Sequence, residues 1–503
     1  MTQEGDATSA QGSESIVRNA GFALASQLIT AAFTAALTIF LARVLGPGPF
    51  GVFSLALGLA GVLALPGDAG ISGSASRFIA ERRGDPEGVR SILRKASLLR
   101  VVTSGAITVV LVLGADLAAD VYDEPDLAWT LRGMAVAIFG QNLLQLYGSS
   151  FTALGRLSLA FRSTLVKSVI ELAASVALVL GGTGAAGAAF GRGAGFLAGG
   201  ALAAVLLQRL LRRTAPSGGT RREPVSSRAL VGYAGALVII DGAFVLFQEI
   251  DVLLIGGIIG ATAAGLFQAP LRLVTFLQYP TYALALAVAP RLAGGAEAGR
   301  EPLRRALRLV ILFQGALIAP LVVWAEPAVA ITLGPDYADS APVLRALAPF
   351  VFLAGIGPLV TLSVNYLGEA RRRVPIAIGA LAVNAAIDVV LLPEIGIIAG
   401  AIGTNVAYAI YIPAHLFICR KMVGLELLPV LVTFLRTLVA AAAMAGLLFA
   451  LGTGDVSLVV LIGGGLAGVA LYLLTLMVLR ETSVAEIREL GGTVAQRLLP
   501  SRT

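Results

Sequence analysis

Ionisable side chains inside apolar stretches are the residues of this sequence best suited to chemistry. The stretch 229–258 contains Asp241, Glu249 and Asp251, and Arg272 lies about 12 residues into the next stretch, ~18 Å at ~1.5 Å per residue. Charges in apolar surroundings are costly, so they mark substrate or ion pathways by default. The guanidinium of Arg272 fits phosphate oxygens bidentately, which predicts a phosphate or sugar anchor, and the acids are predicted ion-coupling groups. A buried ion pair bracing the two stretches explains the same residues equally well.

Four other charges lie within apolar stretches. Lys167 and Glu171 are four residues apart, a helical spacing that lets them neutralise each other, and we prefer this interpretation to a proton relay. Arg192 and Asp388 have no obvious partner in the sequence. Arg192 is therefore a further candidate for substrate binding, and Asp388 a further candidate for a functional charge.

The inner ends of the apolar stretches hold two more candidate cations. Arg18 and Arg77 lie where an anion entering from that side would meet them, although snorkelling to the interface is the alternative. His415 is the only histidine and Cys419 the only cysteine, which excludes disulfides and nearly excludes zinc sites of the Cys/His type. No catalytic constellation stands out, so we expect neither an enzyme nor a bound cofactor or metal.

The composition identifies the elements that must carry these charges. Of 503 residues, 57% are hydrophobic and 13% charged, against roughly 25% charged in an average soluble domain. This balance predicts an all-α polytopic membrane protein. The net charge of +7 does not indicate nucleic-acid binding, because the basic residues lie between apolar stretches. The first residues are polar without a basic region, so we expect an uncleaved first helix.

Fourteen apolar stretches are long enough to be transmembrane helices. The predicted spans are 20–42, 50–79, 98–119, 128–153, 161–181, 185–208, 229–258, 262–290, 305–333, 342–366, 374–393, 397–418, 428–451 and 456–479. The second is too long for one straight helix and contains Pro66, which predicts a kink. Loops after even-numbered spans are basic, whereas the loop after the third span carries five acids, so both termini are predicted to be cytoplasmic and the location to be the cell membrane.

Two motifs recur 214 and 213 residues further along the chain. The segment Leu45 to Phe53 resembles Ile259 to Phe267, with Gly46, Gly51 and Phe53 matched by Gly260, Gly265 and Phe267. Gly155 and Gly187 are matched in the same way by Gly368 and Gly400. The duplication predicts two pseudo-symmetric six-helix lobes of parallel orientation, with two C-terminal helices outside it. The predicted domains are 1–210 (first lobe), 211–227 (cytoplasmic linker), 228–420 (second lobe), 421–480 (last two helices) and 481–503 (cytoplasmic tail, with a surface helix near 483–498).

The sequence is similar to a known family across almost its whole length. Leu41-Ala-Arg-Val-Leu-Gly-Pro, Phe50-Gly-Val-Phe and Arg77-Phe-Ile-Ala-Glu resemble the amino-terminal signature of polysaccharide (O-antigen-type) flippases, in the multidrug/oligosaccharidyl-lipid/polysaccharide exporter superfamily. Further matches are Glu249-Ile-Asp-Val-Leu-Leu-Ile-Gly, Gln268-Ala-Pro-Leu-Arg-Leu and the stretch from Leu333 to Leu344.

The resemblance implies a function and a cavity. Such proteins move polyprenyl-diphosphate-linked sugars between leaflets by alternating access, through a central cavity lined mainly by spans 1, 2, 7 and 8. It implies lipid-linked oligosaccharide, membrane lipids, a polymerase and glycosyltransferases as partners. The sequence has no ATP-binding motif, so we expect a proton or sodium gradient, or downstream consumption of the glycan, to give transport its direction. A multidrug exporter and a peptidoglycan-precursor flippase of the same superfamily remain alternatives. A membrane polymerase would need a large outer loop, which is absent here.

Overall fold

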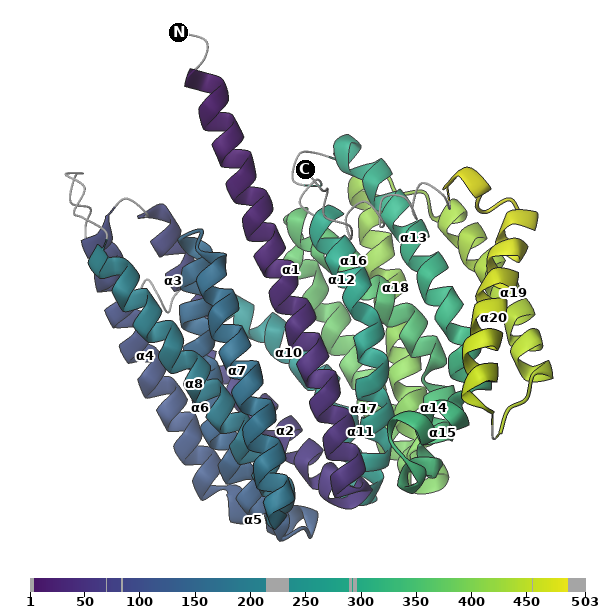
Figure 1. Cartoon of the computed structure of the whole chain (residues 1–503), viewed down its shortest axis with the longest axis horizontal. Coiled ribbons are helices and arrows are strands. Elements are labelled where there is room, and N and C mark those ends of the chain that lie inside the picture. The colour runs from purple at the N-terminus through teal and green to yellow at the C-terminus, as the bar shows by residue number, and fades with distance from the viewer. Residues whose placement is uncertain are drawn as a thin grey trace. The chain divides into compact units, whose positions relative to one another are not determined.

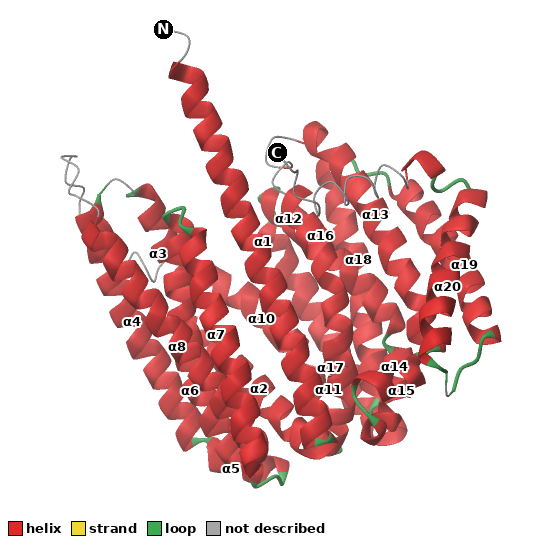
Figure 2. Ribbon diagram, viewed as in Figure 1, coloured by secondary structure: helices red, strands yellow, loops and turns green. Residues whose placement is uncertain are grey.

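The computed structural model describes residues 4–68, 70–82, 85–213, 235–288, 292, 296–454 and 456–486. Every regular element within these ranges is helical, as Figure 2 shows. The predicted linker 211–227 and tail 481–503 lie mostly outside the described residues.

Within the described residues, ten helical segments are long and apolar enough to cross a membrane, so the chain is a multi-pass membrane protein. One of them, Leu157–Arg212, runs over two successive helices. The count of fourteen spans and the division into lobes stay predictions. The candidate spans are Gly21–Leu45, Pro47–Leu65, Pro86–Leu113, Leu157–Arg212, Gly299–Val323, Ala348–Tyr366, Arg373–Ile395, Ile398–Val423, Leu427–Ala450 and Leu458–Val478.

The chain forms two compact units, Met1–Tyr279 with Val374–Gly403, and Pro280–Arg373 with Thr404–Thr503. Figure 1 labels their helices. The first unit contains α1 (Glu4–Leu45), α2 (Pro47–Asp68), α3 (Ile71–Glu81), α4 (Pro86–Leu113), α5 (Ala115–Tyr122), α6 (Asp126–Ala153), α7 (Leu157–Leu178), α8 (Gly184–Arg213), α10 (Gly235–Ile258), α11 (Ala261–Thr275), nearly all of α17 (Arg373–Ile395) and the start of α18 (Ile398–Val423).

The second unit contains the rest of α18 and nearly all of α12 (Tyr279–Val288), followed by α13 (Ala296–Val323), α14 (Ala325–Thr332), α15 (Ala341–Ala346), α16 (Ala348–Tyr366), α19 (Leu427–Ala450) and α20 (Leu458–Val478). Its best-defined core lies between α13, α19 and α20, where Trp324, Met444 and Tyr472 are buried. The hydroxyl of Tyr472 donates to the carbonyl of Leu312 at 2.7 Å, which satisfies its polar end inside this apolar core.

The predicted kink in the second span is a full break. Helix α2 ends at Asp68 and α3 begins at Ile71, after Gly70 with φ 67°. A left-handed residue cannot continue an α-helix, and glycine adopts this conformation without steric cost. The span 50–79 is therefore two helices.

The repeated motif has the same local conformation in both copies. Gly46 has φ 73° before α2 and Gly260 has φ 125° before α11, so both helices begin at a glycine of positive φ. Gly51 and Gly265, the second glycines of the two copies, allow α2 and α11 to approach each other closely. A Cβ on Gly51 would lie 1.8 Å from the carbonyl oxygen of Ala261, and one on Gly265 would lie 2.0 Å from that of Pro47. Only glycine permits this approach.

The small residues of α8 pack against α7. A Cβ on Gly191 would lie 2.4 Å from the backbone nitrogen of Ser175, and one on Gly195 would lie 2.5 Å from the Cβ of Glu171. This close approach is the packing expected of a small-xxx-small row. It also presses the charged residues of α7 against α8.

Candidate functional site

Arg272 on α11 and Glu249 on α10 form the centre of the candidate site, and both belong to the first unit. The two charges interact electrostatically, but the described ion pairs within 4.0 Å do not include them. Arg272 Nε and Glu249 Oε2 are each buried with no hydrogen-bond partner in the described part of the chain. The Glu249 carboxylate lies beside α2, since a Cβ on Gly58 would be 3.2 Å from Oε2. Arg272 Nε can therefore still donate a hydrogen bond inside the unit.

A second charged group joins α7 to α8. Glu171 accepts from Lys167 on its own helix and from Arg192 Nη1 of α8 at 2.8 Å, so the expected Lys167–Glu171 pair is present and Arg192 shares it. The side chains of Lys167 and Glu171 are 9% and 6% exposed. Both cations lie over the ring of Phe196, at 4.5 Å for Lys167 Nζ and 5.0 Å for Arg192 Cζ. The ring face supplies further negative potential to both cations.

Arg192 connects the two groups. It interacts electrostatically with both Glu249 of α10 and Arg272 of α11. Together the groups contain three cations and two acids, so their formal charge is +1. Cations in excess of acids inside an apolar unit can bind an anion, and arginine suits phosphate because its donors form a planar fork.

Asp251, two residues after Glu249 on α10, belongs to a separate acidic group. The amide Nδ2 of Asn384 donates to Asp251 Oδ1 at 2.5 Å, and the Asp388 carboxylate lies within hydrogen-bond reach of Asp251. Among the described residues no donor reaches either oxygen of Asp388, and Asn384 Oδ1 is likewise unpartnered. All three side chains are at most 3% exposed. Two neighbouring buried carboxylates repel each other when both are ionised, so they require a proton or a cation between them.

Helix packing brings this acidic group together. A Cβ on Gly403, at the start of α18, would lie 2.5 Å from Asn384 Oδ1 and 2.6 Å from Asp388 Oδ1. The glycine therefore lets α18 close over the two polar residues of α17. An oxygen-only donor set of this kind suits a proton or a hard monovalent cation better than a soft metal. Among the described residues no cluster of three or more His, Cys, Asp or Glu side chains could hold a metal ion.

Of the other predicted site residues, only Arg77 has a described side chain. Arg77 on α3 pairs with Glu81 at 3.1 Å at an exposed position. The side chains of Arg18 and Asp241 lie outside the described residues, although both positions are helical. His415 is fully buried in the second unit, where its Nδ1 is 2.8 Å from the carbonyl oxygen of Tyr411 and the two rings are 4.2 Å apart. Asn384 was not predicted, and its spacing of four residues from Asp388 was the available signal.

Comparison with known proteins agrees with this arrangement of helices. Residues 16–294 match the family model described as polysaccharide biosynthesis protein. The chain is similar to the probable low-salt glycan biosynthesis flippase Agl15 of Haloferax volcanii, with 22% identity over 86% of this chain and 89% of that protein. It is also similar to the succinoglycan biosynthesis transport protein ExoT of Rhizobium meliloti, with 27% identity over 67% of this chain and 66% of that protein.

Solved structures share the fold. The lipid II flippase MurJ in an inward closed conformation matches with a TM-score of 0.68 and 14% identity, over 90% of this chain and 98% of that one. An inward-facing multidrug resistance MATE transporter of the MOP superfamily matches with a TM-score of 0.64 and 16% identity, over 78% and 95%. The family match covers more than half of the chain. The resemblance found in the sequence is therefore confirmed, and the chain belongs to the polysaccharide biosynthesis protein family.

Proposed function

We propose that this protein is a flippase that moves polyprenyl-diphosphate-linked oligosaccharide across the cell membrane for surface polysaccharide synthesis. Its family, and relatives named as a glycan biosynthesis flippase and a succinoglycan transport protein, support this function. The multi-pass helical chain suits it. Alternating access is the proposed mechanism, with the MurJ and MATE transporters as examples of the fold. Both termini are proposed to be cytoplasmic, and a polymerase and glycosyltransferases to act beside the flippase.

The observation that carries the proposal is the excess of cations at Arg192 and Arg272. A lipid-linked sugar is amphiphilic, but its diphosphate is a dense anion that must cross the apolar region of the bilayer. An unpartnered Arg272 Nε inside the unit provides a donor, and Arg192, which interacts with Arg272 electrostatically, is the proposed second cation. In this proposal the two arginines bind the diphosphate and Glu249 prevents them from binding it too tightly to release.

We further propose that Asp251 and Asp388 couple transport to an ion gradient. Their carboxylates carry a charge of −2 when both are ionised, so binding of a proton or sodium ion would relieve strong repulsion. The pair spans α10 and α17, so its occupancy would change how firmly these helices pack. Asp241 and Glu249 remain secondary candidates for coupling.

The test uses the purified chain in proteoliposomes that contain a fluorescent polyprenyl-diphosphate oligosaccharide. Arg272→Ala is expected to express normally and to transport about 10- to 100-fold more slowly, since a hydrogen bond to a charged group contributes about 1.5–3 kcal/mol. Arg272→Lys should restore part of the rate, because a point charge lacks the bidentate fork. The matched control is Arg132→Ala, which removes an arginine whose pair with Asp116 lies near an end of α6.

Other outcomes decide against the proposal. If Arg272 only braces α10 and α11, Arg272→Ala will fold poorly and Glu249→Gln will rescue it. A fully active Arg272→Ala protein excludes both roles. If deletion of the gene changes drug sensitivity and leaves surface polysaccharide normal, the multidrug-exporter alternative is correct. For coupling, Asp388→Asn should transport without response to pH or sodium gradients, and an unchanged response would remove the acidic pair from the mechanism.

A further inference from the structure

A pocket of about 550 Å³ lies at one end of α13, α19 and α20 in the second unit. Three candidate spans, Gly299–Val323, Leu427–Ala450 and Leu458–Val478, begin or end here, so the pocket lies at the level of one membrane surface. Five arginines and three glutamates line it, giving a formal charge of +2. The remaining lining comes from the first turns of α19.

Three of the five arginines are already paired. Arg308 bonds Glu481 and Glu486, and Arg436 bonds the second oxygen of Glu481 at 2.9 Å. Arg304 bonds Glu301 at 2.8 Å. No ion pair in the described part of the chain involves the other two, Arg305 and Arg480, and both side chains are exposed. The excess charge of the pocket therefore resides on Arg305 of α13 and Arg480 after α20.

The acids of the pocket hold its wall in place. Glu481 is buried, and it accepts hydrogen bonds from Arg308, Arg436 and the hydroxyl of Thr433. Burial alone would raise the pKa of Glu481, but these hydrogen bonds outweigh it and the pKa is lowered. Glu481 is thus an anion that fastens the segment after α20 to α13 and α19, and it cannot also neutralise Arg480.

Arg480 occupies an unfavourable backbone conformation. Its φ is 55°, and the helix-ending bonds from Arg480 N to Met477 O and from Glu481 N to Leu476 O maintain it. This is the C-terminal position at which glycine is preferred, because a side chain there is strained. An arginine at a strained position suggests that its side chain serves a function, since glycine would make the same turn without strain.

Apolar surface runs from the pocket along the outside of α19. Leu428, Leu431 and Leu435 are 71%, 51% and 52% exposed, and they recur at helical spacing beside pocket-lining residues such as Val432 and Arg436. On α20, Val478 is also exposed two residues before Arg480. The surface thus offers cations at its end and a strip of leucines above them, which matches the charge and shape of an anionic lipid.

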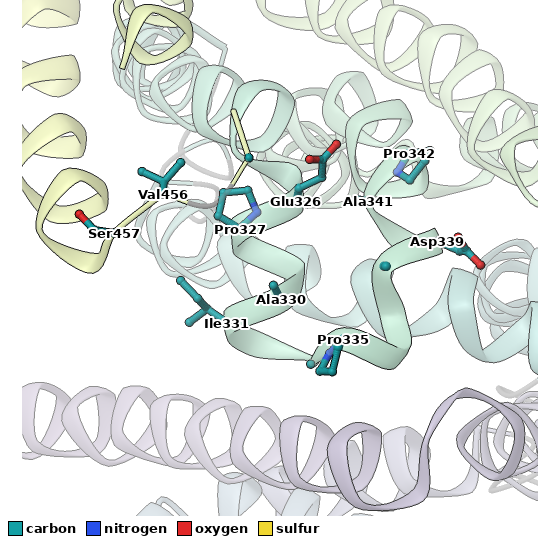
Figure 3. Close-up of a pocket in the computed structure, with 13 residues that line it drawn as sticks. Glu326, Pro327, Ala330, Ile331, Pro335, Asp339, Ala341, Pro342, Val456 and Ser457 are labelled. Carbon is teal, nitrogen blue, oxygen red and sulfur yellow. The ribbon is translucent and has the colours of Figure 1, made fainter. Parts of the chain in front are cut away.

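The other described pocket of this unit has the opposite character. It has a volume of about 750 Å³ and lies at the other end of α13, α19 and α20, between α14, the 3₁₀ segment Pro335–Ser340 and the residues before α20. Figure 3 shows Glu326 and Asp339 among its residues, with Val456 and Ser457 on the side of the segment before α20. Its charged lining residues are both acids, so a phosphate would be repelled there.

We propose that the cationic pocket binds the phosphate headgroup of an anionic phospholipid of the bilayer, through Arg305 and Arg480. The acyl chains lie against Leu428, Leu431 and Leu435 of α19. Basic pockets between transmembrane helices bind anionic headgroups in this way, and the positive-inside pattern of the loops assigns the site to the cytoplasmic leaflet. This inference is independent of the substrate that the protein transports.

The test measures lipid binding to the purified full chain by native mass spectrometry. Phosphatidylglycerol should bind more tightly than phosphatidylcholine of the same acyl chains. The double variant Arg305→Ala/Arg480→Gly should weaken phosphatidylglycerol binding about 30-fold, because each arginine near an anionic surface contributes about fivefold. Arg480→Gly removes the cation and also relieves the positive φ, so its thermal stability without lipid should be unchanged or higher. Arg371→Ala, an exposed arginine elsewhere in the second unit, is the matched control and should bind normally.

Each contrary result overturns the proposal. Equal binding of the two phospholipids, or unchanged binding by the double variant, excludes a headgroup site at these arginines. If millimolar inorganic phosphate displaces phosphatidylglycerol and binds the pocket equally well, the pocket is a site for free phosphate. Retention of a polyprenyl diphosphate but not of phosphatidylglycerol would make it a substrate-docking site. Loss of stability in Arg480→Gly without lipid would show that the arginine only supports the fold.

Discussion

Replacing Glu171 by glutamine is expected to destabilise the protein more than removal of a surface acid. Glu171 is the only acid that an ion pair joins to Lys167 or Arg192 in the described structure, and its side chain is 6% exposed. Glutamine keeps the volume but leaves two cations without a counter-ion in an apolar unit. Removing one partner of a buried pair costs about 3–5 kcal/mol. The ring of Phe196 and the partial exposure of Arg192, at 22%, place the expected loss near the lower end of this range, about 3 kcal/mol.

The assay is reversible unfolding in mixed micelles of increasing dodecyl sulfate, with a double-mutant cycle. Lys167→Met alone should cost about 1 kcal/mol, because Glu171 keeps Arg192. Adding Lys167→Met to Glu171→Gln should restore stability by about 1–2 kcal/mol, since one stranded charge is removed. The matched control is Glu81→Gln, which breaks an exposed pair with Arg77 at the same spacing of four residues and should change stability by less than about 0.5 kcal/mol.

Two results would refute this reasoning. If the stability losses of Glu171→Gln and Lys167→Met are additive in the double variant to within about 0.5 kcal/mol, the two side chains do not interact as a buried group. If Glu171→Gln is as mild as Glu81→Gln, water reaches the cations and the group is not embedded.

Three further predictions concern helix packing, one titrating carboxylate and the membrane topology. Gly51→Ala should lower the melting temperature strongly, because its Cβ would lie 1.8 Å from the Ala261 carbonyl, whereas Gly61→Ala on the same helix has open space and should not. A hydrogen bond from Arg308 lowers the pKa of Glu486 below its usual 4.5, so its stabilisation is complete at neutral pH and is lost as pH falls through the folded-state pKa. The stability difference between wild type and Glu486→Gln should therefore shrink toward pH 4 and below. In a Cys419→Ser background, membrane-impermeant reagents applied from outside should label Asp123→Cys and spare Arg221→Cys; the reverse pattern would contradict the predicted topology.

Local features of the backbone could be anticipated from the sequence. Gly46 and Gly260 stood out as a repeated pair, and each has a positive φ at the start of its helix. The pair Gly155 and Gly368 behaves in the same way, with φ 69° and 78°. The repeat alone does not predict such a conformation, because the matched pair Gly187 and Gly400 lacks a positive φ. The conformation depends on the residue itself and its chain neighbours. The ten apolar helices were predictable for a similar reason, because each must satisfy its own backbone in lipid.

Side-chain partners between helices were not readable in this way. Arg192 is 21 residues from Glu171, and nothing in the spacing shows that α8 turns this arginine toward α7. The glycines Gly191 and Gly195 set that orientation, since they determine which face of α8 can approach α7. A row of small residues predicts close packing, but the partner helix and its rotation are tertiary properties.

The acidic pair shows what the structure adds to the list of buried charges. Glu249 and Asp251 are two residues apart, so a helix turns their side chains to different sides, and the sequence alone assigned both to one role. In the structure Glu249 interacts with Arg192 and Arg272, within the set of charged residues whose formal charge is +1. Asp251 instead lies beside Asp388, and the two carboxylates carry a charge of −2 when both are ionised. Two opposite sides of α10 therefore carry a group suited to an anion and a group suited to a cation. Because both groups share this helix, a cation bound at Asp251 would change the electrostatic environment of Glu249, and in the proposed function this would link ion binding to transport of the diphosphate.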